Sequence, residues 1–320
     1  MQVIARIAIV GAVVFGGQAI AQETLYGVTA TDLVRIDLVN PADVEVVGPH
    51  GLVPTERGGQ TFGAFSMTYD RGTDRLLGLY YFRDEATGHF EQYLVEYDRA
   101  TGAGTLRDLL ASSESDGFVE AIEYVDPLDA VLVSRDPGGT ITTSLESVNP
   151  DGTTTPVTDN GRDNDYAVYD PTRDRFYVID PNNVGRLSRV DLATGETTDL
   201  GPIYSSTGDM AYSARADQIF AYVVDTGQLM TLGNGLGSRL PIPLGFVGGV
   251  GTIQGLAIVD NGQAPACPAD LDGDGVLTGN DLAVFWGFFR RGDMRADINA
   301  DGFLRRSDIF SFVHAYLAGC

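Results

Sequence analysis

The chain has 320 residues, of which 44 are acidic and 21 are basic, and its formal net charge is −23. A surface this acidic repels phosphate backbones, which argues against nucleic acid as a partner. Every basic residue is an arginine, so chemistry that needs a lysine amine, such as Schiff-base formation, is excluded.

Residues 1–21 have the organisation of a signal peptide. Arg6 supplies the positive start, residues 7–15 the short apolar core, and Ala19-Ile20-Ala21 a small-x-small cleavage site. This apolar core is too short to span a bilayer. We therefore expect an exported protein, secreted or associated with the cell surface, with no transmembrane segment in the mature chain.

Residues 22–262 predict an all-β domain, because they are rich in Val, Ile, Tyr, Thr and Gly and have turn residues every eight to twelve positions. A Tyr-Asp-x-x-x-Asp pattern at Tyr69 recurs at Tyr169, as Tyr-Ser-x-x-x-Asp at Tyr212, and in shortened form at Tyr124. Each copy reads as a strand, an Asp-rich turn and a second strand. The spacing, near 45 residues, is typical of four-stranded propeller blades.

The two ends of this domain complement each other. Residues 25–28, 33–38 and 44–47 read as the second, third and fourth strands of a blade, and residues 253–259 supply the missing first strand. Together with blades near 64–108, 119–157, 165–201 and 208–243, this predicts a propeller of about five blades with a split closing blade. A pair of β-sandwiches, a solenoid, or a sixth blade within 48–64 are the alternatives. The motifs look like those of secreted bacterial propellers, a resemblance that concerns fold and not activity.

Propeller ligands usually lie over the central channel, near the start of each innermost strand. Those positions are Ser66, Glu120, Asp165, Asp209 and Gln254. The three carboxylates Glu120, Asp165 and Asp209 are weak catalytic candidates, as a metal site or as the acids of a glycosidase. The alternative, which we favour, is that they are acids lining the channel of an acidic protein.

Two twelve-residue segments, 270–281 and 297–308, have the pattern of calcium-binding loops and lie 27 positions apart. In such a loop, positions 1, 3, 5 and 12 supply side-chain oxygens, position 7 a backbone carbonyl, and position 6 a glycine. The predicted ligands of two Ca2+ ions are Asp270, Asp272, Asp274, Val276 and Asp281 in the first loop, and Asp297, Asn299, Asp301, Phe303 and Asp308 in the second.

An apolar stripe with helical spacing follows each loop. The first contains Leu282, Phe285, Trp286 and Phe289, and the second contains Ile309, Phe312, Val313 and Tyr316. We expect the two helices to pack through these stripes.

Paired calcium loops, each followed by a helix, resemble a dockerin module, here over residues 263–320. The opening Cys-Pro-Ala-Asp and closing Gly-Cys are similar to the GC-type dockerin, and Asp281 and Asp308 match its preference for Asp at position 12. The resemblance implies Ca2+ binding and a cohesin-like or cell-surface partner, often in polysaccharide-degrading assemblies. Positions 10 and 11, where dockerins recognise cohesin, lack the Ser-Thr pair of the best-known cohesin binders.

The only two cysteines, Cys267 and Cys320, bracket this module. In an exported protein they predict a disulfide that joins its ends. Alternatively, Cys320 serves as a handle for intermolecular attachment or sorting.

These observations favour a non-enzymatic binding or scaffolding propeller, with an unknown ligand such as a glycan or a protein. It would be attached through a calcium-dependent EF-hand-like module. The alternative is an extracellular glycoside hydrolase or lactonase-like enzyme that uses the acids at the channel mouth.

Overall fold

In the computed structural model of the chain, the described residues are 23–38, 40–52, 55–57, 60–83, 90–112, 116–137, 143–162, 164–180, 185–203, 206–214, 216–233, 242–259, 269–271, 277–291, 296, 298 and 304–318. The predicted signal peptide lies outside them. No helix within these ranges is long and apolar enough to cross a membrane.

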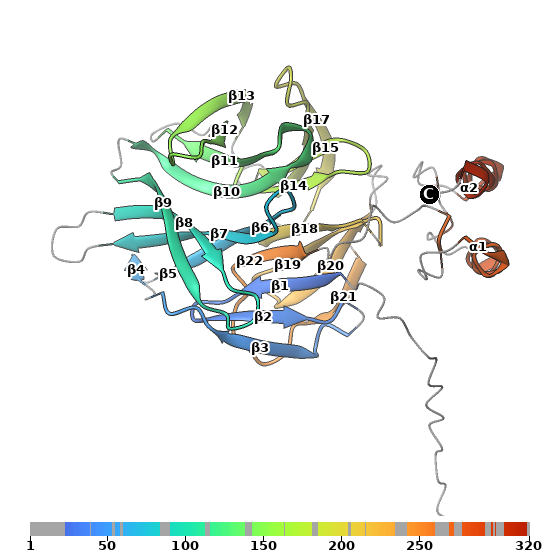
Figure 1. Ribbon diagram of the computed structural model, residues 1–320, viewed down its shortest axis with the longest axis horizontal. Coiled ribbons are helices and arrows are strands. Elements are labelled where there is room, and N and C mark those ends of the chain that lie inside the picture. The colour runs from blue at the N-terminus through green and yellow to red at the C-terminus, as the bar shows by residue number, and fades with distance from the viewer. Residues whose placement is uncertain are drawn as a thin grey trace, which may run out of the picture.

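The protein is mainly β, and five four-stranded antiparallel sheets form the blades of a propeller ring (Figure 1). Four blades use consecutive strands, with the innermost strand first. The first of these blades consists of β6 (Ala64–Asp70), β7 (Arg75–Arg83), β8 (Phe90–Tyr97) and β9 (Gly104–Ala111), and the second of β10 (Phe118–Val125), β11 (Ala130–Asp136), β12 (Thr143–Val148) and β13 (Thr154–Arg162). The third consists of β14 (Tyr166–Asp170), β15 (Arg175–Asp180), β16 (Arg186–Val190) and β17 (Thr197–Pro202). The fourth consists of β18 (Thr207–Ser213), β19 (Gln218–Val223), β20 (Gln228–Gly233) and β21 (Ile242–Phe246).

The fifth blade closes the ring by joining the two ends of the domain, as predicted. Its strands are β22 (Gly255–Val259), β1 (Thr24–Val28), β2 (Asp32–Ile36) and β3 (Val44–Pro49). β1 and β22 pair along their whole length, from Thr24 opposite Val259 to Val28 opposite Gly255. Between β3 and β6 lies a two-stranded hairpin of β4 (Thr55–Arg57) and β5 (Gln60–Phe62), so the sixth four-stranded blade considered from the sequence is absent among the described residues.

The Tyr–Asp repeat forms the turn between the first and second strands of four blades. In each copy the tyrosine hydroxyl donates a hydrogen bond to the carboxylate of the aspartate five residues later. The pairs are Tyr69–Asp74 at 2.7 Å, Tyr124–Asp129 at 2.8 Å, Tyr169–Asp174 at 2.8 Å and Tyr212–Asp217 at 2.6 Å. All four aspartates have a positive φ, between 46° and 56°. Aspartate tolerates this left-handed conformation better than most residues, which explains the repeated motif.

The hydrophobic core lies between the blades. Five clusters of buried apolar side chains each draw on two neighbouring blades, and the closing blade contributes to two of them. Val259 of β22, for example, packs in one cluster with Tyr80 of β7, whereas Ile258 packs in another with Phe220 of β19. The apolar contacts therefore continue around the ring.

A separate helical unit follows the propeller in the chain. Its helices are α1 (Gly279–Arg291) and α2 (Arg306–Ala318), which begin 27 residues apart. Phe285 and Phe312 are buried and stacked, with ring centroids 4.3 Å apart. For these two residues the predicted packing of one helix against the other is confirmed. Leu282, Trp286 and Val313 instead remain 41%, 39% and 41% exposed, because a pair of short helices covers only the centre of each stripe.

Candidate functional site

The five positions predicted at the channel mouth do lie at the start of the innermost strands. Ser66, Glu120 and Asp209 are the third residues of β6, β10 and β18, and Asp165 and Gln254 directly precede β14 and β22. The backbone N–H of Ser66 donates to the Gln254 carbonyl at 3.1 Å.

The three carboxylates of this group gather around Tyr166, the first residue of β14. Burial raises the pKa of the Tyr166 hydroxyl, and the nearby charges of Asp165, Asp209 and Glu120 raise it further. We call Glu120, Asp165 and Asp209, grouped around Tyr166, the acidic mouth; within this group the side chain of Asp209 is buried.

Asp209 stabilises the ring through hydrogen bonds to neighbouring innermost strands. Its side chain is buried, and one carboxylate oxygen accepts the backbone N–H groups of Met67 on β6 at 2.7 Å and of Leu256 on β22 at 2.8 Å. The Ser66 hydroxyl donates to the other oxygen at 3.3 Å. Burial raises the pKa of Asp209 to about 7, and the main-chain donors oppose that rise. Asp209 thus connects three innermost strands and offers little to a substrate.

Glu123, on β10, is a second buried carboxyl group that the sequence interpretation missed. Its side chain accepts the backbone N–H of Tyr169 on β14 and the hydroxyl of Thr68 on β6, both at 2.9 Å. Burial raises the pKa of Glu123 to about 8. The signal for it was present, since a charged residue in the apolar run Ala-Ile-Glu-Tyr-Val of an innermost strand requires a buried partner.

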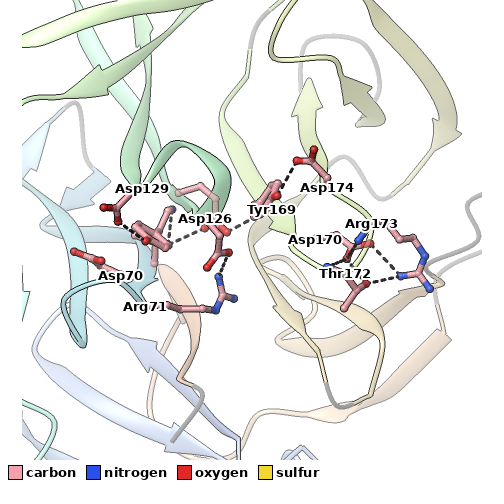
Figure 2. A network of polar contacts seen from close by, with 12 residues as sticks. Asp70, Arg71, Asp126, Asp129, Tyr169, Asp170, Thr172, Arg173 and Asp174 are labelled. Carbon is pink, nitrogen blue, oxygen red and sulfur yellow. Dashed lines mark hydrogen bonds and ion pairs between the residues drawn. The ribbon is translucent and has the colours of Figure 1, made fainter. Parts of the chain in front are cut away.

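At the ends of the innermost strands, ionic contacts join neighbouring blades (Figure 2). The Arg71 guanidinium pairs with Asp126 of the next blade at 2.9 Å. Arg173 binds Asp170 of its own blade at 3.1 Å and also Asp217 of the following blade. The side chains of this network satisfy one another, so we assign it to the stability of the ring.

The helical unit contains the predicted calcium loops, of which the structure describes only parts. Asp270, Asp281 and Asp308 are among the described residues. The other predicted ligands, Asp272, Asp274, Val276, Asp297, Asn299, Asp301 and Phe303, lie outside the described residues, as do Cys267 and Cys320.

The two loops have matching environments wherever they can be compared. Asp281 and Asp308, at loop position 12, are both fully buried in the first turn of their helices. Asp281 accepts the N–H of Thr278 and Asp308 that of Arg305, each at 2.7 Å, and both donors occupy loop position 9. Ala269 and Ala296, which precede the two loops, are also fully buried. The 27-residue duplication is thus a duplication of structure.

The donor set fits a calcium ion. The predicted ligands in both loops are hard oxygen donors, which Ca2+ prefers, and the carboxylates at position 12 are buried. Within the described ranges alone, no group of three or more His, Cys, Asp or Glu side chains is placed to hold a metal ion.

No family model matches the chain, and no curated protein matches it. Solved structures with a similar fold include a chain of a nidogen–laminin complex (10% identity, TM-score 0.45, covering 74% of this chain and 98% of that one). TolB from Acinetobacter baumannii is 12% identical, with a TM-score of 0.43 and coverage of 75% and 67%. A gluconolactonase from Xanthomonas campestris is 11% identical, with a TM-score of 0.37 and coverage of 61% and 78%. These comparisons concern the fold alone.

Proposed function

We propose that the protein is an exported, non-enzymatic binding or scaffolding propeller, attached through a calcium-dependent dockerin-like unit to a cohesin-type or cell-surface partner. The observation that carries the proposal is the duplicated helical unit. Its two halves place the same residue types in the same environments, with Asp281 and Asp308 buried at the helix starts and Phe285 stacked on Phe312.

In this proposal calcium neutralises the crowded carboxylates and ties each loop to its helix. In the first loop the side chains of Asp270, Asp272, Asp274 and Asp281 and the carbonyl of Val276 would hold one ion. In the second loop the corresponding ligands are Asp297, Asn299, Asp301, Asp308 and the carbonyl of Phe303. Metal affinity then adds directly to the folding stability of the helical unit.

The single tryptophan makes this testable in the full chain. Trp286 lies on α1 and the propeller contains no tryptophan, so tryptophan fluorescence reports on the helical unit alone. We expect a saturable fluorescence change when Ca2+ is added to the chelator-treated protein. The double variant Asp270→Ala, Asp297→Ala should lose this change, because it removes the first ligand of each loop. Asp293→Ala, an acidic residue between the loops, is the matched control and should respond as the wild type does.

The partner is tested by capture from the native secretome on the immobilised protein, with calcium or with chelator. A protein retained only with calcium, and not by the double variant, would support the attachment role. A wild-type protein whose fluorescence does not respond to Ca2+ would refute the calcium-dependent unit.

The enzymatic alternative depends on the acidic mouth around Tyr166. Asp209 is occupied by main-chain donors, which leaves Glu120 and Asp165 as the acids that could act on a glycan or lactone. A hydrolysis screen beside a glycan array decides between the two functions, with Asp165→Ala as the variant and Asp108→Ala on β9 as the control. Turnover lost only in Asp165→Ala would establish the enzyme, whereas binding without turnover in all three proteins would exclude it.

A further inference from the structure

The innermost strands β10 and β18 carry two buried carboxyl groups, Glu123 and Asp209, that interact with each other. Asp209 and Glu123 bind adjacent residues of β6: Asp209 accepts the Met67 N–H, and Glu123 accepts the Thr68 hydroxyl. The negative charge of Asp209 is close enough to raise the pKa of Glu123 beyond the effect of burial. Two such groups sharing a low-dielectric site do not both ionise easily, and one of them tends to keep a proton.

The surrounding donors distinguish the two groups. Met67 and Leu256 present backbone N–H groups to Asp209, and such groups can only donate, so they favour a carboxylate there. Glu123 faces the Thr68 hydroxyl, which can accept a hydrogen bond as well as donate one. A proton on Glu123 therefore has a hydroxyl acceptor at 2.9 Å, whereas the shortest contacts of Asp209 are two backbone N–H donors and its contact with the Ser66 hydroxyl is longer, at 3.3 Å.

Other charged groups near the pair do not reverse this assignment. From the turn after β6, Arg71 favours ionised Glu123, but its guanidinium is paired with Asp126. Glu120 on β10 and Asp165, which directly precedes β14, act together with Asp209 as negative charges near Tyr166. Asp70 and Asp170, at the ends of β6 and β14, are paired with Arg75 and Arg173, and β22 carries no titratable side chain. Within the described ranges, no arginine or histidine side chain is hydrogen-bonded to Asp209 or Glu123.

We propose that Glu123 carries the proton of this acid pair at neutral pH and donates it to the Thr68 hydroxyl, and that its loss to solvent base loosens the joint between β6, β10 and β14. Protonation of Glu123 then stabilises the contacts among these three innermost strands, and so the ring. This inference is independent of the ligand and partner proposed above.

The sign of the effect follows from linkage. The pKa of Glu123 is about 8 in the folded chain and 4.5 in the unfolded chain, so its stabilising contribution is complete below pH 4.5 and declines as the pH rises towards 8. Between pH 7 and pH 9 this group alone should increase the unfolding constant of the propeller about tenfold. This change is measured by urea unfolding at the two pH values, with tyrosine fluorescence as the signal for the propeller.

Glu123→Gln is the informative variant, because its amide can donate to Thr68 and accept from Tyr169, as the protonated acid does. It should lose most of the tenfold change. Glu146→Gln, on β12, is the control: the pKa of Glu146 is lowered by hydrogen bonds from Thr154 and Arg135 despite its burial, so this variant should keep the wild-type change.

Infrared spectroscopy of the full chain detects the proton directly. We expect the carbonyl band of a protonated carboxyl group at pH 7, its loss near pH 9, and its absence in Glu123→Gln. A wild-type protein without this band between pH 5 and pH 7 would overturn the proposal, even if Glu123→Gln failed to fold. An equal pH dependence of stability in wild type and Glu123→Gln would also overturn it.

Discussion

Four tyrosine–aspartate pairs determine how the first two strands of a blade are joined. Each aspartate both adopts the left-handed backbone conformation and accepts the tyrosine hydroxyl, as Asp174 does from Tyr169. Burial raises the pKa of Tyr169, so its hydroxyl stays a donor at all ordinary pH values. The residue that repeats in the sequence is therefore the one that satisfies both requirements of the turn.

Replacing Asp174 with Ala should destabilise the propeller by about 2 kcal/mol. The variant leaves the Tyr169 hydroxyl without its acceptor and places a less tolerant residue at positive φ. Asp174→Asn keeps an acceptor and tolerates the conformation, so it should cost less than half as much. Urea unfolding followed by tyrosine fluorescence measures both, and equal losses would contradict the two-part role of the aspartate.

Two single residues, His50 and Glu123, make buried contacts that could not be predicted from the sequence. His50 follows β3 outside any strand, yet it is buried, and its ring accepts the N–H of Leu52 at 3.1 Å. Glu123 was not noticed at all. In both cases the partner comes from another part of the chain, Thr29 for His50 and Tyr169 for Glu123, and no local pattern encodes such a contact.

Among the elements, the outermost strands share an irregularity that limits edge pairing. In β3, β17 and β21, one extra residue bulges beside a glycine: Val47 before Gly48, Leu200 before Gly201, and Leu244 before Gly245. Such bulges twist a strand and interrupt the row of free backbone groups at its edge. The three blades thus protect their exposed edges by the same device.

The two C-terminal helices depend on one aromatic stack. Phe285→Ala removes a fully buried ring from a small core and should cost about 3–5 kcal/mol, enough to unfold the helical unit. Phe310→Ala is the matched control, because the same residue type on α2 is 73% exposed. Thermal unfolding followed by Trp286 fluorescence should show a lost or strongly lowered transition for Phe285→Ala only. Similar transitions in both variants would mean that the stack does not hold the unit together.

At the scale of the whole molecule, the ring is closed by pairing of its two ends. β1 lies between β22 and β2, so it holds together segments from opposite ends of the domain. The hydroxyl of Ser213, on β18, also donates to Glu23, which adds a bond from the neighbouring blade.

Removing β1 should therefore destabilise all five blades. A shortened chain that begins at Thr29 would leave β22 and β2 with open edges and two interblade clusters incomplete. We expect self-association in size-exclusion chromatography and loss of the single cooperative urea transition. A chain that begins at Glu23 keeps β1 and is the control. Monomeric, cooperative behaviour of the shorter chain would show that closure is not required.

The fold was largely predictable because its signals are periodic and local. The Tyr–Asp turns marked the blades, and the incomplete blade at Leu25 pointed to closure by residues near Ile258. The positions at the channel mouth followed from the same register. The sequence could not show that the Asp209 carboxylate accepts hydrogen bonds from backbone N–H groups, since those groups belong to strands more than 40 positions away.

Because Asp209 accepts main-chain hydrogen bonds from two other innermost strands, β6 and β22, a single substitution at this position should disturb three of the five blades together.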